Sequence, residues 1–153
     1  MKNTTMLKWL YMLELTAPVF YRVNSLFIRD PEEKKKFKHF EESELPHSPM
    51  IKEFLRKKYN MGIYPIPKFL IQLVTAIVSF IIGLLGKKAI YYFEYRFEKK
   101  ACHAYLNLMN NTDDPEFKKF AALLHDEELP HRNYFMGKLD IPTEGYSDIL
   151  SKD

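Results

Sequence analysis

Residues 98–131 read EKKACHAYLNLMNNTDDPEFKKFAALLHDEELPH, and residues 14–47 repeat this segment without a gap. After a shift of 84 positions, 12 of the 34 aligned residues are identical, where chance would give roughly two. The identities include the first and last residue of each segment and an Asp-Pro-Glu triplet within it. The sequence therefore predicts that most of the chain consists of two copies of one unit.

Each copy is expected to fold as a helical hairpin. In the triplets 30–32 and 114–116 a carboxylate stands at the N-cap position, followed by proline and a second acid. This order is typical of a helix start, because it satisfies free N–H groups and suits the positive end of the helix dipole. Helices should therefore begin near residues 31 and 115, and the preceding ones should end near residues 28 and 110. Apolar residues recur at helical spacing in both copies, namely Leu7, Leu10, Tyr11, Phe20, Phe27, Phe93, Phe97, Tyr105 and Leu108.

Two hairpins supply the four helices of a bundle, so the predicted fold class is all-α. We expect one domain over residues 1–153, with hairpins at about 5–49 and 88–137. The connection of about 50–87 separates them, and the tail 138–153 is expected to be turn-like and peripheral.

The connection contains an apolar segment of a different kind. Residues 69–86 carry no charge over 18 positions, and lysines stand on both sides. This length is at the short limit for crossing a bilayer, and the preceding residues 51–59 form a basic amphipathic stretch suited to an anionic membrane surface. Three alternatives are open: a helix embedded in one leaflet, a core helix or oligomer interface, and a spanning helix. We favour the first, an extra membrane-associating helix, because a span would place the two hairpins on opposite sides.

Both copies end in Glu-x-x-His, at Glu44 to His47 and at Glu128 to His131. Residues three apart share a helix face, so each motif offers a carboxylate and an imidazole to one point. A further glutamate lies thirty positions earlier in each copy, within an apolar helix. One Glu from each of two helices and Glu-x-x-His from each of the other two is the ligand pattern of ferritin-like carboxylate di-metal proteins. The predicted metal ligands are Glu14, Glu44, His47, Glu98, Glu128 and His131.

The ligand types favour two iron ions, with manganese as the lesser alternative. Four carboxylates compensate the charge of two neighbouring cations, whereas without metal they would repel one another in a core. The alternative is that the glutamates are exposed surface acids. Glu14 argues against this, because it stands between apolar residues in Leu10–Leu15.

Other side chains are candidates for a role around the metals. Tyr21 and Tyr105 follow Glu14 and Glu98 by seven positions, so they could hydrogen-bond ligands or supply an electron, although core packing explains them equally well. His103 follows Glu98 by five positions and could contact a metal ligand without binding metal itself, and a packed or surface position is the alternative. The remaining assignments are supporting roles for Glu41, Glu42, Asp126 and Glu127, surface positions for His39 and His125, and a local kink at Pro46 and Pro130.

The bulk composition limits the function classes. One cysteine, Cys102, excludes an internal disulfide framework and fits a reducing compartment. The net charge of +3 and the lack of a dense basic run interleaved with aromatics argue against a nucleic-acid partner. The N-terminus lacks the pattern of a cleaved signal peptide.

The chain resembles the demethoxyubiquinone hydroxylases, membrane-associated di-iron enzymes of ubiquinone synthesis, and more distantly the alternative oxidases. The resemblance covers roughly residues 10–135. It rests on Glu14 with Tyr21, on Gly86-Lys87 followed by Glu98, His103 and Tyr105, and on Asp126-Glu127-Glu128-Leu129-x-His131. The sequence departs from the family at Lys99, where the hydroxylases often carry an acid, and at Pro46 and Pro130.

The resemblance implies a monooxygenase that uses O₂, an external reductant and a quinone-like or other lipophilic substrate. The protein would be peripheral or monotopic on a reducing, cytoplasmic-type membrane face, and a homo-oligomer is open. Two alternatives remain: a quinol oxidase, and a rubrerythrin- or ferritin-like iron binder without catalysis.

Overall fold

The computed structural model describes residues 2–63 and 66–142, and this part of the chain is helical without strands. The all-α prediction is therefore confirmed. The α-helices of this part are α1 (Lys2–Asn24), α2 (Pro31–Glu44), α3 (His47–Tyr59), α4 (Lys68–Leu84), α5 (Lys87–Asn110) and α6 (Pro115–Lys138). Residues 143–153, most of the predicted tail, lie outside the described part.

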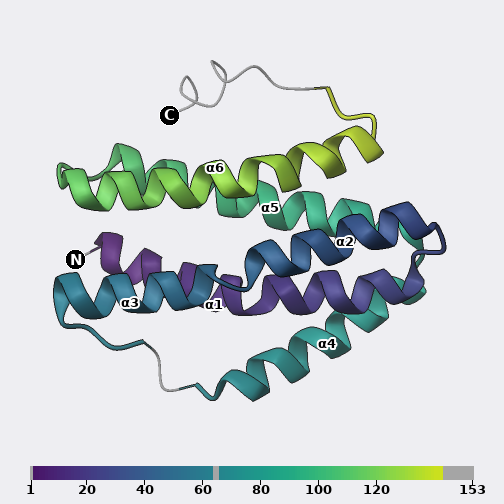
Figure 1. Ribbon diagram of the computed structural model, residues 1–153, viewed down its shortest axis with the longest axis horizontal. Coiled ribbons are helices and arrows are strands. Elements are labelled where there is room, and N and C mark those ends of the chain that lie inside the picture. Colours follow the sequence, from purple (N-terminus) through teal and green to yellow (C-terminus); the bar gives the residue numbers. More distant parts are fainter. Residues whose placement is uncertain (1, 64–65, 143–153) are drawn as a thin grey trace.

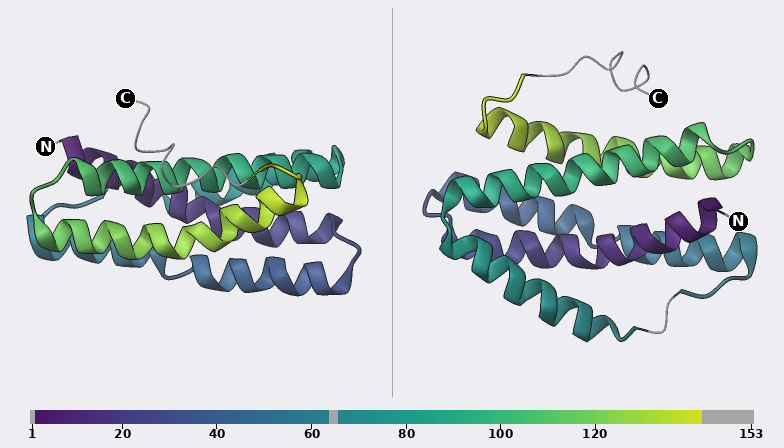
Figure 2. Two further views of the ribbon diagram at one scale, coloured as in Figure 1. Left: turned by 90° about the horizontal axis from the view of Figure 1, so that it is seen from above. Right: turned by 180° about the vertical axis from the view of Figure 1, so that it is seen from behind.

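The long helices lie alongside one another. Helices α2 and α3 follow one line and cover α1, while α5 and α6 pack side by side (Figure 1). Helix α4 crosses α1 obliquely on its outer side (Figure 2). The chain thus brings residues from α1, α2, α3, α5 and α6 to one interior.

The helix starts agree with the sequence. The Asp30 side chain accepts a hydrogen bond from the Glu33 N–H at 2.8 Å. Asp114 accepts from the N–H groups of Glu116 and Phe117 at 3.0 and 3.1 Å. Helices begin at Pro31 and Pro115 as predicted. The preceding helices end at Asn24, followed by a 3-10 turn over Ser25–Phe27, and at Asn110, close to the predicted ends.

The two prolines of the Glu-x-x-His motifs have different effects. At Pro46 the chain leaves the helix, because α2 ends at Glu44 and α3 begins at His47. Helix α6 continues through Pro130. A local kink within a helix was therefore the wrong prediction at Pro46, where the missing N–H and the pyrrolidine ring separate two helices.

The apolar core forms two layers, one toward each end of the helices. One layer combines the first half of α1 with α3, the second half of α5 and the first half of α6. The other combines the second half of α1 with α2 and the opposite halves of α5 and α6. The segments between these halves carry the predicted metal ligands. Cys102 is buried, as expected for a small apolar residue.

Helix α4 packs with small and polar residues toward the protein and large apolar residues toward the outside. Its buried residues are Thr75, Ser79 and Gly83, and a Cβ on Gly83 would lie 2.2 Å from the Phe27 ring. Large apolar side chains of the same helix are exposed: Phe69, Leu70, Leu73, Val74, Ile77, Val78, Phe80, Ile81 and Leu84. This is the reverse of a core helix. Among the helices of residues 2–63 and 66–142, none combines the length and apolarity needed to cross a membrane.

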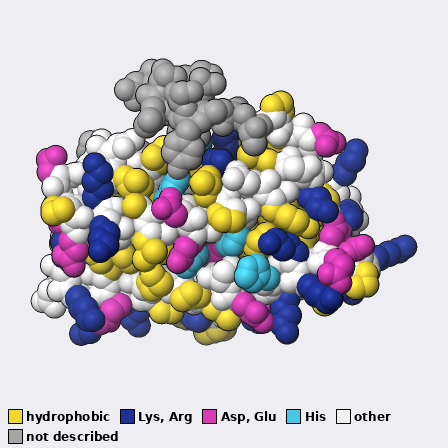
Figure 3. All heavy atoms as spheres, turned by 45° about the horizontal axis from the view of Figure 1, so that its top comes forward, with side chains coloured by type: hydrophobic (Ala, Val, Ile, Leu, Met, Phe, Trp, Pro, Cys, Tyr) yellow, Lys and Arg dark blue, Asp and Glu magenta, His cyan; other side chains and the backbone are white. Residues whose placement is uncertain are grey.

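The surface charges are mixed. On the face shown in Figure 3, Lys and Arg side chains alternate with Asp and Glu. Lys34 and Lys35 are exposed on α2, as expected for a solvated helix face.

One ion cluster, in which the acid Glu33 is buried and its two lysines are partly exposed, joins three helices outside the predicted metal site. Glu33 of α2 accepts hydrogen bonds from Lys138 and Tyr91, both at 2.6 Å, and pairs with Lys87 at 2.5 Å. Burial alone would raise the pKa of Glu33, but the hydrogen bonds from the two lysines outweigh it and lower the pKa to about 2. The cluster thus fixes α2 to α5 and α6.

Glu33→Gln is expected to lower the free energy of unfolding at pH 7 by about 1–3 kcal/mol, because two lysines lose their counter-charge. The folded pKa lies below the unfolded one, so this stabilisation is complete above about pH 5 and is lost as the pH falls toward 2. Urea unfolding at several pH values measures it. Glu32→Gln, a neighbouring exposed acid paired only at the surface, should change little. An equal effect of the two substitutions would contradict the assignment.

Candidate metal centre

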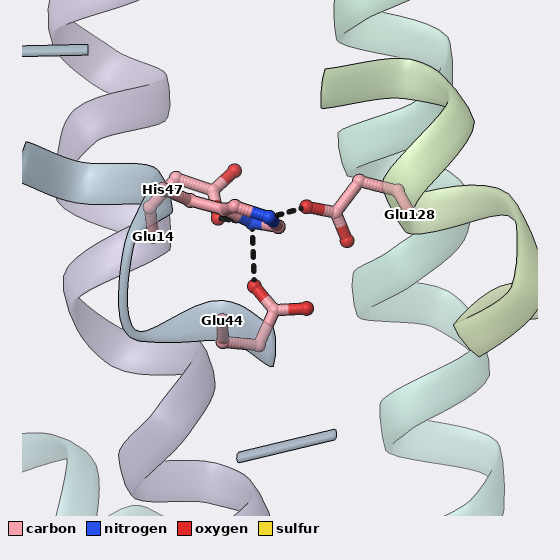
Figure 4. Close-up of side chains that lie close together, drawn as sticks. All are labelled: Glu14, Glu44, His47 and Glu128. Carbon is pink, nitrogen blue, oxygen red and sulfur yellow. Dashed lines mark hydrogen bonds and ion pairs between the residues drawn. The ribbon is translucent and has the colours of Figure 1, made fainter. Parts of the chain in front are cut away.

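The structure brings all six predicted ligands together in the protein interior. Each is at most 4% exposed. They come from five helices: Glu14 from α1, Glu44 from the end of α2, His47 from the start of α3, Glu98 from α5, and Glu128 and His131 from α6. Figure 4 shows four of these side chains pointing toward one another.

The ligand atoms fall into two overlapping groups, each within 4.8 Å and each able to hold a metal ion. One group is Glu14, Glu44, His47 and Glu128, and the other is Glu44, Glu98, Glu128 and His131. Glu44 and Glu128 belong to both. Each group thus has one imidazole and one carboxylate of its own, and two carboxylates are shared between adjacent positions.

Both imidazoles face the shared carboxylates with Nδ1. The Nδ1 atom of His47 lies 3.0 Å from Glu44 Oε2 and 3.0 Å from Glu128 Oε1. Glu14 Oε2 is 3.3 Å from the same nitrogen. The Nδ1 atom of His131 lies 2.7 Å from Glu44 Oε1. The break at Pro46 contributes to this geometry, because it places His47 at the first turn of a new helix beside the last residue of α2.

Several of these buried atoms make no hydrogen bond despite the short separations. They are Glu44 Oε1, Glu98 Oε2, Glu128 Oε1 and His131 Nδ1. Buried polar atoms are normally paired, and leaving one unpaired is costly. Here carboxylate oxygens and imidazole nitrogens converge on a common space. The donor set fits two metal ions of the iron or manganese type.

The far nitrogen of each imidazole contacts a second polar group. His47 Nε2 lies 2.8 Å from Glu127 Oε2, and His131 Nε2 lies 3.1 Å from the Ser43 hydroxyl. Such contacts fix the orientation of a metal-binding imidazole. The sequence predicted this role for Glu127 but not for Ser43.

The two tyrosines reach across to the opposite glutamates. The Tyr105 hydroxyl donates to Glu14 Oε1 at 2.6 Å, and the Tyr21 hydroxyl donates to Glu98 Oε1. A shift of 84 positions converts one contact into the other. The repeat in the sequence is thus also a repeat in the contacts of the site.

Protons compensate the charge of this cluster. Burial, aided by the charge of Glu128, raises the pKa of Glu14 to about 8, and burial raises the pKa of Glu98 above its usual range. Burial alone would lower the pKa of His131, but the nearby carboxylates of Glu128 and Glu44 outweigh it and raise the pKa to about 9. The same kind of interaction raises the pKa of His47. Metal ions must displace these protons.

Metal affinity is therefore expected to increase with pH between about 6 and 9, by roughly tenfold per pH unit for each proton released below its pKa. Mn²⁺ titrations in buffers of different pH, with a pH indicator for released protons, measure this. Glu14→Gln removes one of the titrating groups. The slope of log affinity against pH in this variant should therefore be smaller by about one released proton. An affinity that stays constant over this range would contradict the proton displacement.

Three histidines lie outside the cluster. His103 is exposed and lines a surface hollow of about 400 Å³ with Trp9 and Arg96, so the structure does not bring it to the ligands. His39 is exposed, as expected. His125 was expected at the surface, and this is wrong: it is 3% exposed, because it lies three positions before Glu128 on the same face of α6.

One buried acid near the ligands was not predicted from the sequence. Glu94 is 0% exposed and accepts a hydrogen bond from Asn24. Its position four residues before Glu98 was the available signal, because residues four apart share a helix face.

Comparisons of the chain with protein-family models, with curated proteins and with solved structures found no match. The ligand geometry is therefore the basis for inferring a function.

Proposed function

We propose that the protein is a membrane-associated di-iron hydroxylase of ferritin-like fold, which uses O₂ and an external reductant on a quinone-like or other lipophilic substrate. The supporting observation is the pair of ligand groups that share Glu44 and Glu128. The fold would be a four-helix bundle of α1, the α2–α3 line, α5 and α6, built from two repeated hairpins. Helix α4 is then an addition to the bundle.

The side chains divide into roles on this proposal. Glu44 and Glu128 belong to both ligand groups and would serve both metal ions, whereas each of the other four ligands would serve one ion: Glu14 and His47 in one group, Glu98 and His131 in the other. Two irons bound in this way supply a site for O₂ and the electrons that activate it. Tyr21 and Tyr105 hold the terminal glutamates in place through their hydroxyl groups. The two apolar layers keep bulk water away from the centre.

Helix α4 supports the choice of a lipophilic substrate. Its exposed apolar side chains form a continuous face, and its opposite side packs on α1, the helix that carries Glu14 and Tyr21. Lys68 at the start of α4 and Lys88 shortly after its end are exposed and suit an anionic membrane surface. A substrate dissolved in the membrane would then meet the protein along α4.

The direct test is anaerobic loading with Fe²⁺, followed by O₂ in the presence of lipid extract and a chemical reductant. Mass analysis should then find a quinone-like or other lipid product that has gained one oxygen atom, with metal-free protein as the control. Quinol oxidation without oxygen insertion would instead indicate an oxidase. Iron oxidation with unchanged lipids would indicate an iron-handling protein. Either of these results would contradict hydroxylation.

A further inference from the structure

A buried polar chain connects α4 to α5 beside the metal centre. One carboxyl oxygen of Glu94 accepts a hydrogen bond from Asn24 Nδ2 of α1 at 2.6 Å. The Asn24 side-chain oxygen accepts one from the Ser79 hydroxyl of α4 at 2.8 Å. The second oxygen of Glu94, Oε2, is buried and has no hydrogen-bond partner. All three side chains are 0% exposed.

The internal repeat shows that packing does not require this polarity. Within the repeat, a shift of 84 positions places Asn24 on Leu108, and continuing the same shift four positions before the aligned segments places Glu94 on Leu10. Both leucines are 0% exposed and belong to the apolar layer at the other end of the helices. The same chain therefore fills the equivalent place with two apolar side chains. A buried acid there costs stability that a leucine would not, so a role beyond packing is indicated.

Glu94 lies beside the half of the metal centre that contains Glu98. It lies one helical turn from Glu98 and on the same face of α5. Burial is the main cause that raises the pKa of Glu94 to about 8, and the charge of Glu44 adds to it. The Asn24 hydrogen bond and the charge of His131 act in the opposite direction. Burial thus favours the protonated form of Glu94.

We propose that Glu94 donates protons to the half of the metal centre formed by Glu98 and His131, and that Asn24 and Ser79 are positioning residues that hold its carboxyl group. This rests on the proposed function, in which RH + O₂ + 2H⁺ + 2e⁻ gives ROH + H₂O. The external reductant supplies the two electrons. One of the two protons leaves Oε2 of Glu94, which becomes a carboxylate and regains its proton from solvent before the next turnover.

Two variants separate proton donation from packing. Glu94→Gln keeps an oxygen that accepts from Asn24 but has no acidic proton. Glu94→Leu with Asn24→Leu installs the apolar pair that the other half of the repeat already has. Glu33→Gln is the matched control, because it makes the same change at a buried acid that belongs to a different cluster.

The measurements are iron content, O₂-dependent turnover, urea unfolding and the infrared spectrum of the Fe²⁺-loaded protein without O₂. Glu94→Gln should bind two irons, lose a carbonyl band of a protonated carboxyl group, and turn over roughly 10- to 100-fold more slowly. The double leucine variant should show the same loss of turnover with a higher unfolding midpoint. Glu33→Gln should lose stability but retain turnover and the band.

The outcomes distinguish the two proposals. Wild-type turnover or an unchanged carbonyl band in Glu94→Gln would overturn proton donation and leave the hydroxylase assignment intact. A wild-type protein that binds two irons but consumes no O₂ would overturn the proposed function, and proton donation with it.

Discussion

Replacement of Glu128 by alanine is expected to abolish binding of both metal ions, whereas replacement of Glu14 should affect only one. Glu128 belongs to both ligand groups, and Glu14 belongs to one. Without Glu128, each ion loses a negative ligand in a buried site, where uncompensated charge is costly. We expect affinity for both ions to fall by at least about 100-fold, since even outer contacts of metal ligands contribute 10- to 100-fold. Anaerobic Fe²⁺ titration gives the stoichiometry, and circular dichroism shows whether the helices persist.

Two further substitutions make this result specific. Glu128→Gln retains the size of the side chain, so loss of iron in this variant is not a cavity effect. Glu127→Gln changes the adjacent residue, which is 45% exposed at its side chain, lies 2.8 Å from the far nitrogen of His47 and belongs to neither ligand group. This variant should lower the affinity for one metal ion by about tenfold and leave the affinity for the other unchanged. If Glu128→Gln still binds two ions, or if Glu14→Gln loses both, the shared-ligand arrangement is wrong.

The sequence predicted the helix starts and the ligands because both depend on local spacing. Asp30 with Pro31 determines a helix start through contacts within four residues. The second Glu-x-x-His motif places Glu128 and His131 on one face of α6. In the first motif the short spacing alone keeps Glu44 and His47 close together across the break between α2 and α3. The repeat then supplied the long-range information, since equivalent positions in two copies are expected at equivalent places around a common centre.

The features that the sequence did not predict depend on contacts between distant segments. Ser79 meets Asn24 across 55 positions, and no local pattern marks this pair. The burial of His125 depends on which face of α6 turns inward, and its polar side chain suggested the surface. At Pro46 a local rule indicated a disturbance, but it could not determine whether the helix would bend or end.

Helix α4 illustrates the same limit. An apolar run of this length is compatible with a core, an interface or a membrane surface, because hydropathy alone does not say which side meets the protein. The structure shows the packed side as Thr75, Ser79 and Gly83, spaced by four. These are the small and polar positions of the segment, so the apolar ones are left outward.

The outward orientation of the apolar side chains of α4 predicts that this helix binds the membrane surface. Ile77→Glu combined with Ile81→Glu is expected to release the protein from anionic phospholipid vesicles, with the partition coefficient falling by at least about 100-fold. Both side chains are 54% exposed on the outer face of α4. Each substitution removes apolar area worth roughly 2 kcal/mol on burial and adds a charge that the membrane interior disfavours. Co-sedimentation with vesicles measures the bound fraction.

The control is Leu123→Glu, compared with Ile81→Glu alone. Leu123 is an apolar residue of α6 with 47% exposure, so the chemical change and the initial exposure are matched while the location differs. It should leave vesicle binding unchanged, and the α4 variants should still bind two irons because their side chains point away from the ligands. Loss of iron in the α4 variants would show that this helix supports the core. Equal release by Leu123→Glu, or a wild-type protein that ignores vesicles, would reject α4 as the membrane contact.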